Sequence, residues 1–150
     1  MNKILTFIVN EDNKLLLVKG SNKDPQFKKS FWYVVTGACE KEDKTLKDTV
    51  IREISEETGI KIINDIRYLN WIFKYNSLGE ECTEYAYITF VKSEKIELNE
   101  ENIDCKWCDL EEFINEINWF GDKERVRKVL KLALDKKVYF NEEFIEEIKE

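Results

Sequence analysis

Hydrophobic and polar residues alternate with two different periods, and the change of period separates predicted strands from predicted helices. Residues 3–10 and 14–20 are apolar, β-branched runs separated by the turn signal NEDN, which predicts a β-hairpin. Residues 20–30 contain glycine, proline and many polar side chains, which is typical of a loop. Residues 31–37 (FWYVVTG) return to a strand pattern. The first quarter of the chain is therefore predicted to be mainly β-structure.

Helical spacing begins near Thr45. Apolar residues recur three and four positions apart up to Gly59, which is placed to end the helix. Two long strands follow, over 61–75 and 83–94, with a predicted loop at 76–82. The order strand, loop, helix, strand, strand indicates an α/β fold.

The C-terminal third is predicted to be helical. Residues 109–117 form a helix that begins at Asp109, in a variant of the capping box. Residues 122–135 carry apolar side chains along one side and form a strongly amphipathic helix. The last ten residues, 141–150, are predicted to form a short final helix. We expect a single domain over 1–150, in which 122–150 are the helical C-terminal part.

Composition supports a compact domain. The chain has 150 residues, of which 43% are hydrophobic and 13% aromatic, enough to build a real core. No run of about 18 apolar residues is present, and the start turns polar too early for a secretory signal. We therefore expect a cytoplasmic protein with no membrane partner.

The charge is unevenly distributed. The net charge is −7, yet residues 1–36 hold six lysines against three acidic residues. An acidic body argues against binding a nucleic-acid polymer, which requires lysine and arginine to replace counterions. A local basic loop beside an acidic body suits a small polyanion bridged by metal.

Four cysteines raise the question of a metal or redox site. Only Cys105 and Cys108 form a C-x-x-C pair, Cys39 and Cys82 are scattered, and the chain has no histidine. A zinc site needs four ligands at suitable spacing. We therefore expect free thiols in a reducing compartment.

Three carboxylates gather near the end of the helix predicted from Thr45. At about 100° per residue, Glu53, Glu56 and Glu57 fall within one arc and can point at one place. Arg52 lies four residues before Glu56 and can pair with it. Like charges at a negative helix end are unfavourable unless a cation compensates, and a solvated acidic face is the alternative. Oxygen ligands without histidine favour Mg²⁺ or Mn²⁺.

Gly37 and the stretch REISEETGI (52–60) resemble the box of the Nudix hydrolases. That pattern is G, five residues, E, seven residues, then R-E-U-x-E-E-x-G-U, where U is bulky and aliphatic. The second half matches at all seven specified positions, but the interval from Gly37 to Arg52 is one residue longer than the pattern. Either Asp43 or Lys44 therefore takes the place of the first glutamate.

The resemblance implies an α/β/α sandwich with a mixed β-sheet. It further implies that Glu53, Glu56 and Glu57 bind divalent metal, Mg²⁺ or Mn²⁺, while Arg52 pairs with a glutamate and orients the helix. Another acidic residue from a distant loop commonly serves as ligand or base. Counting six residues back from Trp107 selects Glu101, with Glu100 as its competitor.

The strand WYVVTG (32–37) and the later tract 98–113 look like the Nudix subgroup that hydrolyses nucleoside triphosphates. The expected reaction is metal-dependent hydrolysis of a diphosphate linkage, giving a nucleoside monophosphate and pyrophosphate. Lys19, Lys28 and Lys29 are candidates for binding the outer phosphates, although solubility lysines on a surface loop are an equal alternative.

Two other functions stay open. One is a dinucleoside polyphosphate or nucleotide-sugar hydrolase that uses the same metal site. The other is a catalytically silent Nudix-like domain that binds a nucleotide. We expect a monomer or homodimer whose partner is a small nucleotide. A base could stack on aromatic residues, of which the candidates are Phe27, Trp32, Trp71, Phe73 and Tyr75.

Overall fold

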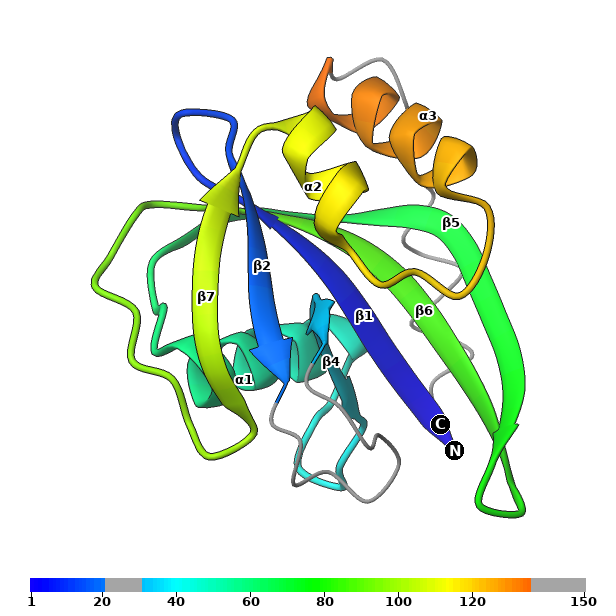
Figure 1. Cartoon of the computed structure of the whole chain (residues 1–150). Helices are drawn as coiled ribbons and strands as arrows, with labels where there is room; N and C mark the ends of the chain where they lie inside the picture. Colours follow the sequence, from blue (N-terminus) through cyan, green and yellow to red (C-terminus); the bar gives the residue numbers. More distant parts are fainter. Residues whose placement is uncertain (21–30, 136–150) are drawn as a thin grey trace.

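A mixed sheet of seven strands carries helices on both faces in the computed structural model, which describes residues 1–20 and 31–135. The strands are β1 (Asn2–Val9), β2 (Leu15–Gly20), β3 (Trp32–Tyr33), β4 (Val35–Ala38), β5 (Ile63–Ser77), β6 (Glu80–Val91) and β7 (Asn102–Cys108). The helices are α1 (Leu46–Thr58), α2 (Leu110–Glu116) and α3 (Lys123–Leu134). In Figure 1, α1 lies behind the sheet, and α2 and α3 lie in front of it. The predicted α/β/α sandwich is confirmed.

The sheet divides into two parts that meet at the β1–β2 hairpin. Strand β1 runs parallel to β6 and antiparallel to β4, whereas β2 pairs antiparallel with β3 and β7. The pairing of β1 with β2 is registered only at Val9 and Leu15, close to the turn. Beyond that point each strand has a different neighbour. The short strand β4, which ends where the loop to α1 begins, therefore lies beside β1.

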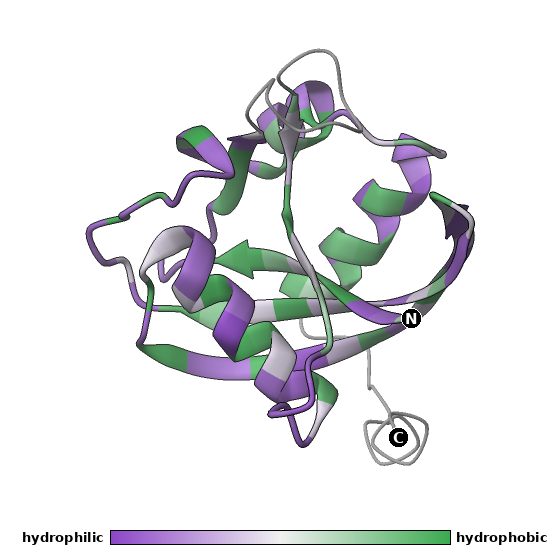
Figure 2. Ribbon diagram, turned by 90° about the horizontal axis from the view of Figure 1, so that it is seen from below, coloured by the Kyte–Doolittle hydropathy of each residue, from purple (hydrophilic) through white to green (hydrophobic). Residues whose placement is uncertain are grey.

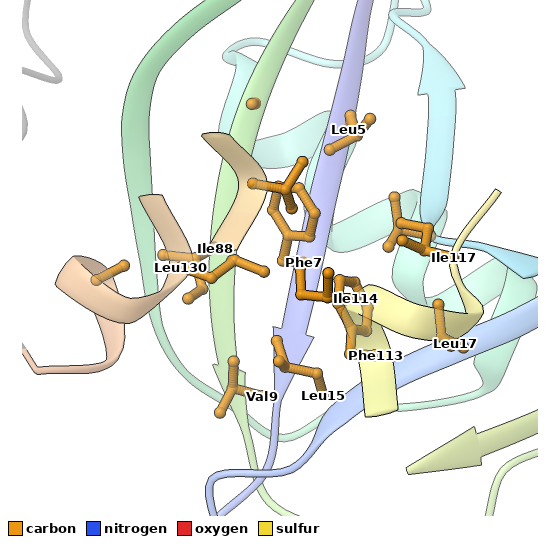
Figure 3. Packing of buried hydrophobic residues seen from close by; sticks show 14 of the residues in the cluster. Leu5, Phe7, Val9, Leu15, Leu17, Ile88, Phe113, Ile114, Ile117 and Leu130 are labelled. Atoms are coloured by element: carbon orange, nitrogen blue, oxygen red, sulfur yellow. The ribbon is translucent and has the colours of Figure 1, made fainter. Parts of the chain in front are cut away.

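Each face of the sheet has its own hydrophobic core. On the α2/α3 face, Phe7 packs edge-on against Phe113, with ring centroids 6.0 Å apart, and Figure 3 shows this core closing around Phe7. On the α1 face, Val50 and Ile54 are fully buried against strand residues such as Ile4. Green and purple segments alternate along the helices in Figure 2, as one-sided packing requires. Helix α1 is thus fixed to the sheet through its apolar side.

The ends of α1 are set by local sequence. Thr45 accepts a hydrogen bond from the Asp48 backbone N–H, and the Asp48 side chain accepts from the Thr45 backbone, which completes a capping box. Gly59 ends the helix in the left-handed conformation, with φ of 78°. The predicted start at Thr45 and end at Gly59 are both confirmed.

Two strand predictions need correction. Residues 31–37 do not form one strand, because Trp32 and Tyr33 pair with β2 while Val35–Ala38 pair with β1. The predicted loop at 76–82 is also wrong. Strands β5 and β6 continue through it, and only Leu78 and Gly79 turn the chain. Both have positive φ, 51° and 81°, as a two-residue hairpin turn of type I′ requires.

The helices predicted at 109–117 and 122–135 are confirmed as α2 and α3. Asp109 begins α2 by accepting a hydrogen bond from the Glu112 backbone, at 2.8 Å. The loop predicted after Gly20 and the helix predicted at 141–150 lie outside the described residues. Over residues 1–20 and 31–135, no helix is long and apolar enough to span a membrane.

Candidate active site

The Glu53 side chain of α1 lies directly against Gly37 of β4. A Cβ atom built on Gly37 would lie 2.1 Å from the Glu53 carboxyl carbon, far inside any real contact. Only glycine therefore leaves room for this carboxylate between helix and strand. The first glycine of the motif is explained by this close approach.

Arg52 links the carboxylates of the loop and the helix. Its Nη2 atom lies 2.9 Å from Asp43 Oδ2, and its Nη1 atom lies 2.9 Å from Glu53 Oε1. A longer contact of 3.3 Å joins Nη1 to Glu56, which is the i,i+4 pair predicted from the sequence. One guanidinium group thus orients three acidic side chains.

The structure distinguishes between the two alternatives for the first motif glutamate. Asp43 is buried and accepts hydrogen bonds from Arg52, from the Thr49 hydroxyl and from the Glu40 backbone N–H. The hydrogen bonds from Arg52 are the main reason that the pKa of Asp43 lies well below its ordinary value. Lys44 is exposed. Asp43 therefore occupies the position of the missing glutamate.

Glu57 has a buried oxygen without a partner. Its Oε1 atom accepts a hydrogen bond of 3.2 Å from Asn102 Nδ2, but no hydrogen-bond donor among the described residues reaches Oε2. Burial is the main reason that the pKa of Glu57 is raised to about 9, and the charge of Glu101, a hydrogen bond from the protonated Glu57 carboxyl group to Glu53, and the charge of Glu53 add to it. An orphaned buried carboxylate oxygen is costly, and a cation would remove that cost.

Glu53 and Glu56 differ in their surroundings although they are neighbours on α1. Glu53 is 9% exposed, and burial raises its pKa despite the hydrogen bond from Arg52. The Glu56 side chain is 52% exposed and faces solvent beside Arg52. The buried pair, Glu53 and Glu57, therefore forms the inner part of the site, and Glu56 forms its rim.

The remaining predicted ligand, Glu101, is exposed, and it lies close enough to Glu57 for its charge to raise the Glu57 pKa. In the part of the chain that the structure describes, no three acidic or thiol side chains already surround one point. Glu53 and Glu56 both turn towards Arg52 instead. The donor set, carboxylate oxygens with one unpartnered buried atom, fits a hard divalent ion once those side chains rotate.

Asn102 is a site residue that the sequence analysis missed. It is the first residue of β7, is 8% exposed, and pairs across the sheet with Gly20 where the register shifts. Its amide fixes the orientation of the Glu57 carboxylate. No motif signals a single buried asparagine at the start of a strand. Its place immediately after Glu101 was the one available indication.

The predicted phosphate-binding lysines are only partly described. Lys19 lies on the same face of β2 as Leu15 and Leu17, which is the α2/α3 face, and its ammonium sits 5.6 Å from the Trp32 ring centroid. The structure therefore does not bring Lys19 to the carboxylates on α1. Lys28 and Lys29 lie outside the described residues.

The C-x-x-C pair does not form a site. Cys105 packs at the edge of the α1-side core, whereas Cys108 is buried in the α2/α3-side core. Residues three apart on a strand point to opposite faces, so the two thiols cannot share a metal or a disulfide. All four cysteines are free, as predicted.

Comparisons with known proteins agree with this fold and helix. The family model for the NUDIX domain matches residues 2–130. The NAD-capped RNA hydrolase NudC of Vibrio atlanticus (strain LGP32) is 34% identical over 105 residues, which cover 68% of this chain and 35% of that protein. The chain thus matches about a third of the length of this relative.

Solved structures share the architecture at lower identity. The MutT protein from Methanosarcina mazei Go1 superposes with a TM-score of 0.67 at 20% identity, covering 93% of this chain and 96% of the other. The NUDIX domain of Shewanella oneidensis NrtR, complexed with ADP ribose, gives 0.69 at 18% identity, covering 89% and 88%.

The fold and the carboxylate-bearing helix define a class of hydrolase with a mixed-sheet sandwich. The chain belongs to the Nudix family, whose members act on nucleotide derivatives and generally use divalent metal ions.

Proposed function

We propose that this protein hydrolyses a diphosphate linkage in a nucleoside diphosphate derivative. A (d)NTP or a similar triphosphate, which gives the monophosphate and pyrophosphate, is the favoured substrate. The observation that carries the proposal is the unpartnered Oε2 atom of Glu57, buried beside Glu53. A pair of buried carboxylates with raised pKa values costs stability, and such pairs are concentrated at functional sites.

Glu53 and Glu57 are the principal ligands of Mg²⁺ or Mn²⁺ in this proposal, and Glu56 and Glu101 complete the set. A bound divalent ion would neutralise phosphate oxygens and lower the pKa of a water molecule. Glu57 offers Oε2 directly, since Asn102 already holds Oε1. Glu53 and Glu56 would become available by rotating away from Arg52, whereas Glu101 is exposed and is not among the described residues that pair with Arg52.

Besides the metal ligands, other residues of the chain hold the helix in place and take part in proton transfer and phosphate binding. Arg52, anchored on the Ala38 carbonyl oxygen at 2.9 Å, keeps α1 in register with the sheet. Glu56 faces solvent and can serve either as a ligand or as the base that takes a proton from water. Lys28 and Lys29, which lie outside the described residues, stay the proposed ligands of the outer phosphates, whereas Lys19 is set aside because it lies on the other face of the sheet.

Product analysis tests this function. The protein is incubated with Mg²⁺ or Mn²⁺ and a panel of nucleoside triphosphates, dinucleotides and nucleotide sugars, and every product is identified. Pyrophosphate together with a monophosphate from the triphosphates supports the proposal. Release of inorganic phosphate alone, or no turnover of any panel member with either metal, argues against it.

A second candidate substrate is a dinucleotide or a nucleotide sugar. It is favoured by the 34% identity to the NAD-capped RNA hydrolase NudC, whose named substrate contains a dinucleotide cap. The same carboxylates would then cleave between two phosphates that carry a nucleoside or sugar on both sides. Mononucleotides released from a dinucleotide faster than pyrophosphate from a triphosphate would favour this candidate.

A catalytically silent nucleotide-binding domain is the alternative from another class. Tight nucleotide binding without hydrolysis under all metal conditions would support it. A cytoplasmic location, a monomeric or homodimeric state and the absence of a nucleic-acid partner stay predictions. Light scattering and binding assays with RNA test the last two.

A further inference from the structure

A second buried carboxylate, Glu84 on β6, lies on the face of the sheet opposite α1. It is 4% exposed and alternates along its strand with Ala86 and Ile88 of the α2/α3-side core. The Tyr75 hydroxyl donates a hydrogen bond of 3.0 Å to its Oε2 atom. Among the described residues, Oε1 receives no hydrogen bond. Half of this buried acid is therefore available to a ligand.

Aromatic side chains surround Glu84. Phe73 is its cross-strand partner on β5, and Tyr75 lies two residues further along the same face. Tyr33 is close enough for the charge of Glu84 to contribute to its raised pKa, which is mainly due to burial. Phe73, Tyr75 and Tyr33 are all half-buried, so each ring also reaches solvent. The acid lies at the base of an aromatic rim.

Glu84 is also aligned with the carboxylate helix. It pairs in register with Lys3 on β1, and Lys3 pairs with Ala38 on β4. Two strand spacings place Glu84 about 10 Å from Ala38 across the sheet. The Ala38 carbonyl oxygen accepts a hydrogen bond from Arg52. Glu84 and the carboxylates of α1 therefore lie near the same end of β4, on opposite faces of the sheet.

We propose that Glu84 recognises the base of the substrate and selects a heterocycle with two adjacent N–H donors, the ring N–H and the neighbouring 2-amino group that guanine and pterins share. This inference rests on the function proposed above.

The donor pattern follows from the chemistry of the acid. An ionised carboxylate only accepts hydrogen bonds. Oε1 is open, and Oε2, which accepts from Tyr75, keeps a second lone pair, so the two oxygens can accept a pair of parallel donors, as they do from arginine. Guanine presents a ring N–H beside an amino group. Hypoxanthine lacks the amino group, and adenine places an acceptor beside its donor. The half-buried rings of Phe73 and Tyr33 pack on Trp119, with ring centroids 5.6 and 5.8 Å away, and form the apolar rim that the base would contact.

Burial raises the pKa of Glu84, and the positive charge of Lys3 opposes that rise. Donors from a ligand would stabilise the ionised acid further. A purely structural Glu84, satisfied by Tyr75 and Lys3, predicts no preference among bases.

Calorimetric binding of nucleoside monophosphates tests the proposal without requiring hydrolysis. GMP, IMP and AMP are titrated into the wild-type protein, the Glu84→Gln variant and the Glu81→Gln control, an exposed acid on the same strand. We expect the wild-type protein and the control to bind GMP about 10- to 100-fold more tightly than IMP or AMP. Glu84→Gln should remove that preference. Neopterin, competing with GMP, distinguishes a pterin ligand from a guanine ligand.

Equal binding of GMP and IMP by the wild-type protein would overturn the proposal. An equal loss for all three nucleotides in Glu84→Gln would do the same, because it indicates a structural role. If Glu84→Gln does not fold, Tyr75→Phe replaces it and should reduce the GMP preference. Base selectivity without any hydrolysis would leave Glu84 as a recognition residue and refute only the proposed function.

Discussion

Asp43 accepts hydrogen bonds from Arg52 through both carboxylate oxygens, with Oδ1 3.1 Å from Nε and Oδ2 2.9 Å from Nη2. An aspartate is one methylene shorter than the glutamate of the family pattern, and the segment between Asp43 and Arg52 is one residue longer than in the pattern. The two departures offset each other. The irregular first half of the motif therefore still anchors the arginine that orients α1.

Asp43→Asn tests this anchor. The change keeps the shape but removes the charge of a buried hydrogen-bonded group, so the free energy of unfolding should fall by about 1–3 kcal/mol. Urea unfolding measures it. Lys44→Ala is the matched control and should change stability by less than about 0.5 kcal/mol. A larger loss in Lys44→Ala than in Asp43→Asn would contradict the assignment.

The same pair predicts a pH dependence. The pKa of Asp43 is below its ordinary value of 3.8 in the folded state, so its contribution to stability is complete above that value. It should decline as the pH falls below 3.8 towards the folded pKa. The difference between wild type and Asp43→Asn in urea titrations should shrink over that range. A difference that grows on acidification would refute the pairing.

Gly37→Ala should displace Glu53. The added Cβ would meet the Glu53 carboxyl group at 2.1 Å, so helix or side chain must move, at a cost of about 1–3 kcal/mol. Binding of Mn²⁺, followed by electron paramagnetic resonance, should weaken as well. Gly121→Ala is the control, because its Cβ would approach nothing closer than 3.4 Å. Unchanged metal binding in Gly37→Ala would show that Glu53 is not a ligand.

Asn102→Leu tests the orientation of Glu57. The change leaves Glu57 Oε1 without its donor, and partners of metal ligands typically contribute 10- to 100-fold to metal affinity. Mn²⁺ affinity should therefore fall by about that factor while the thermal unfolding temperature shows that the fold remains. Asp104→Asn, an exposed position on the same strand, should leave the affinity unchanged. Equal affinities in both variants would remove Asn102 from the site.

The parts of the fold that depend on nearby residues were predictable. The cap at Thr45 and the end at Gly59 follow from side chains within one helical turn. The separation of 31–37 into β3 and β4 was not predictable, because it depends on which distant strands each half joins. The extension of β5 and β6 through 76–82 was missed because the polar residues there lie at the exposed end of a long hairpin.

The candidate site likewise contains residues that the sequence predicted from local spacing and residues that only distant contacts bring into place. Glu53, Glu56, Glu57 and Arg52 share a helix, and their spacing placed them together. Asp43 and Asn102 act through contacts that the fold creates, and neither belongs to a periodic pattern. Lys19 was proposed from charge alone, and the alternation of β2 places it on the other face of the sheet.

Turnover by Glu57→Gln, with the product panel and with Mn²⁺ binding measured in parallel, tests the central claim most directly. The amide keeps the size of the side chain but loses the charge that a metal ligand needs. We predict that in Glu57→Gln hydrolysis falls by several orders of magnitude and Mn²⁺ binding weakens, while the circular dichroism spectrum stays like that of wild type. The control Glu42→Gln, which changes an exposed acid in the loop before α1, should keep wild-type turnover and Mn²⁺ binding. Turnover and metal binding like wild type in Glu57→Gln would contradict the account.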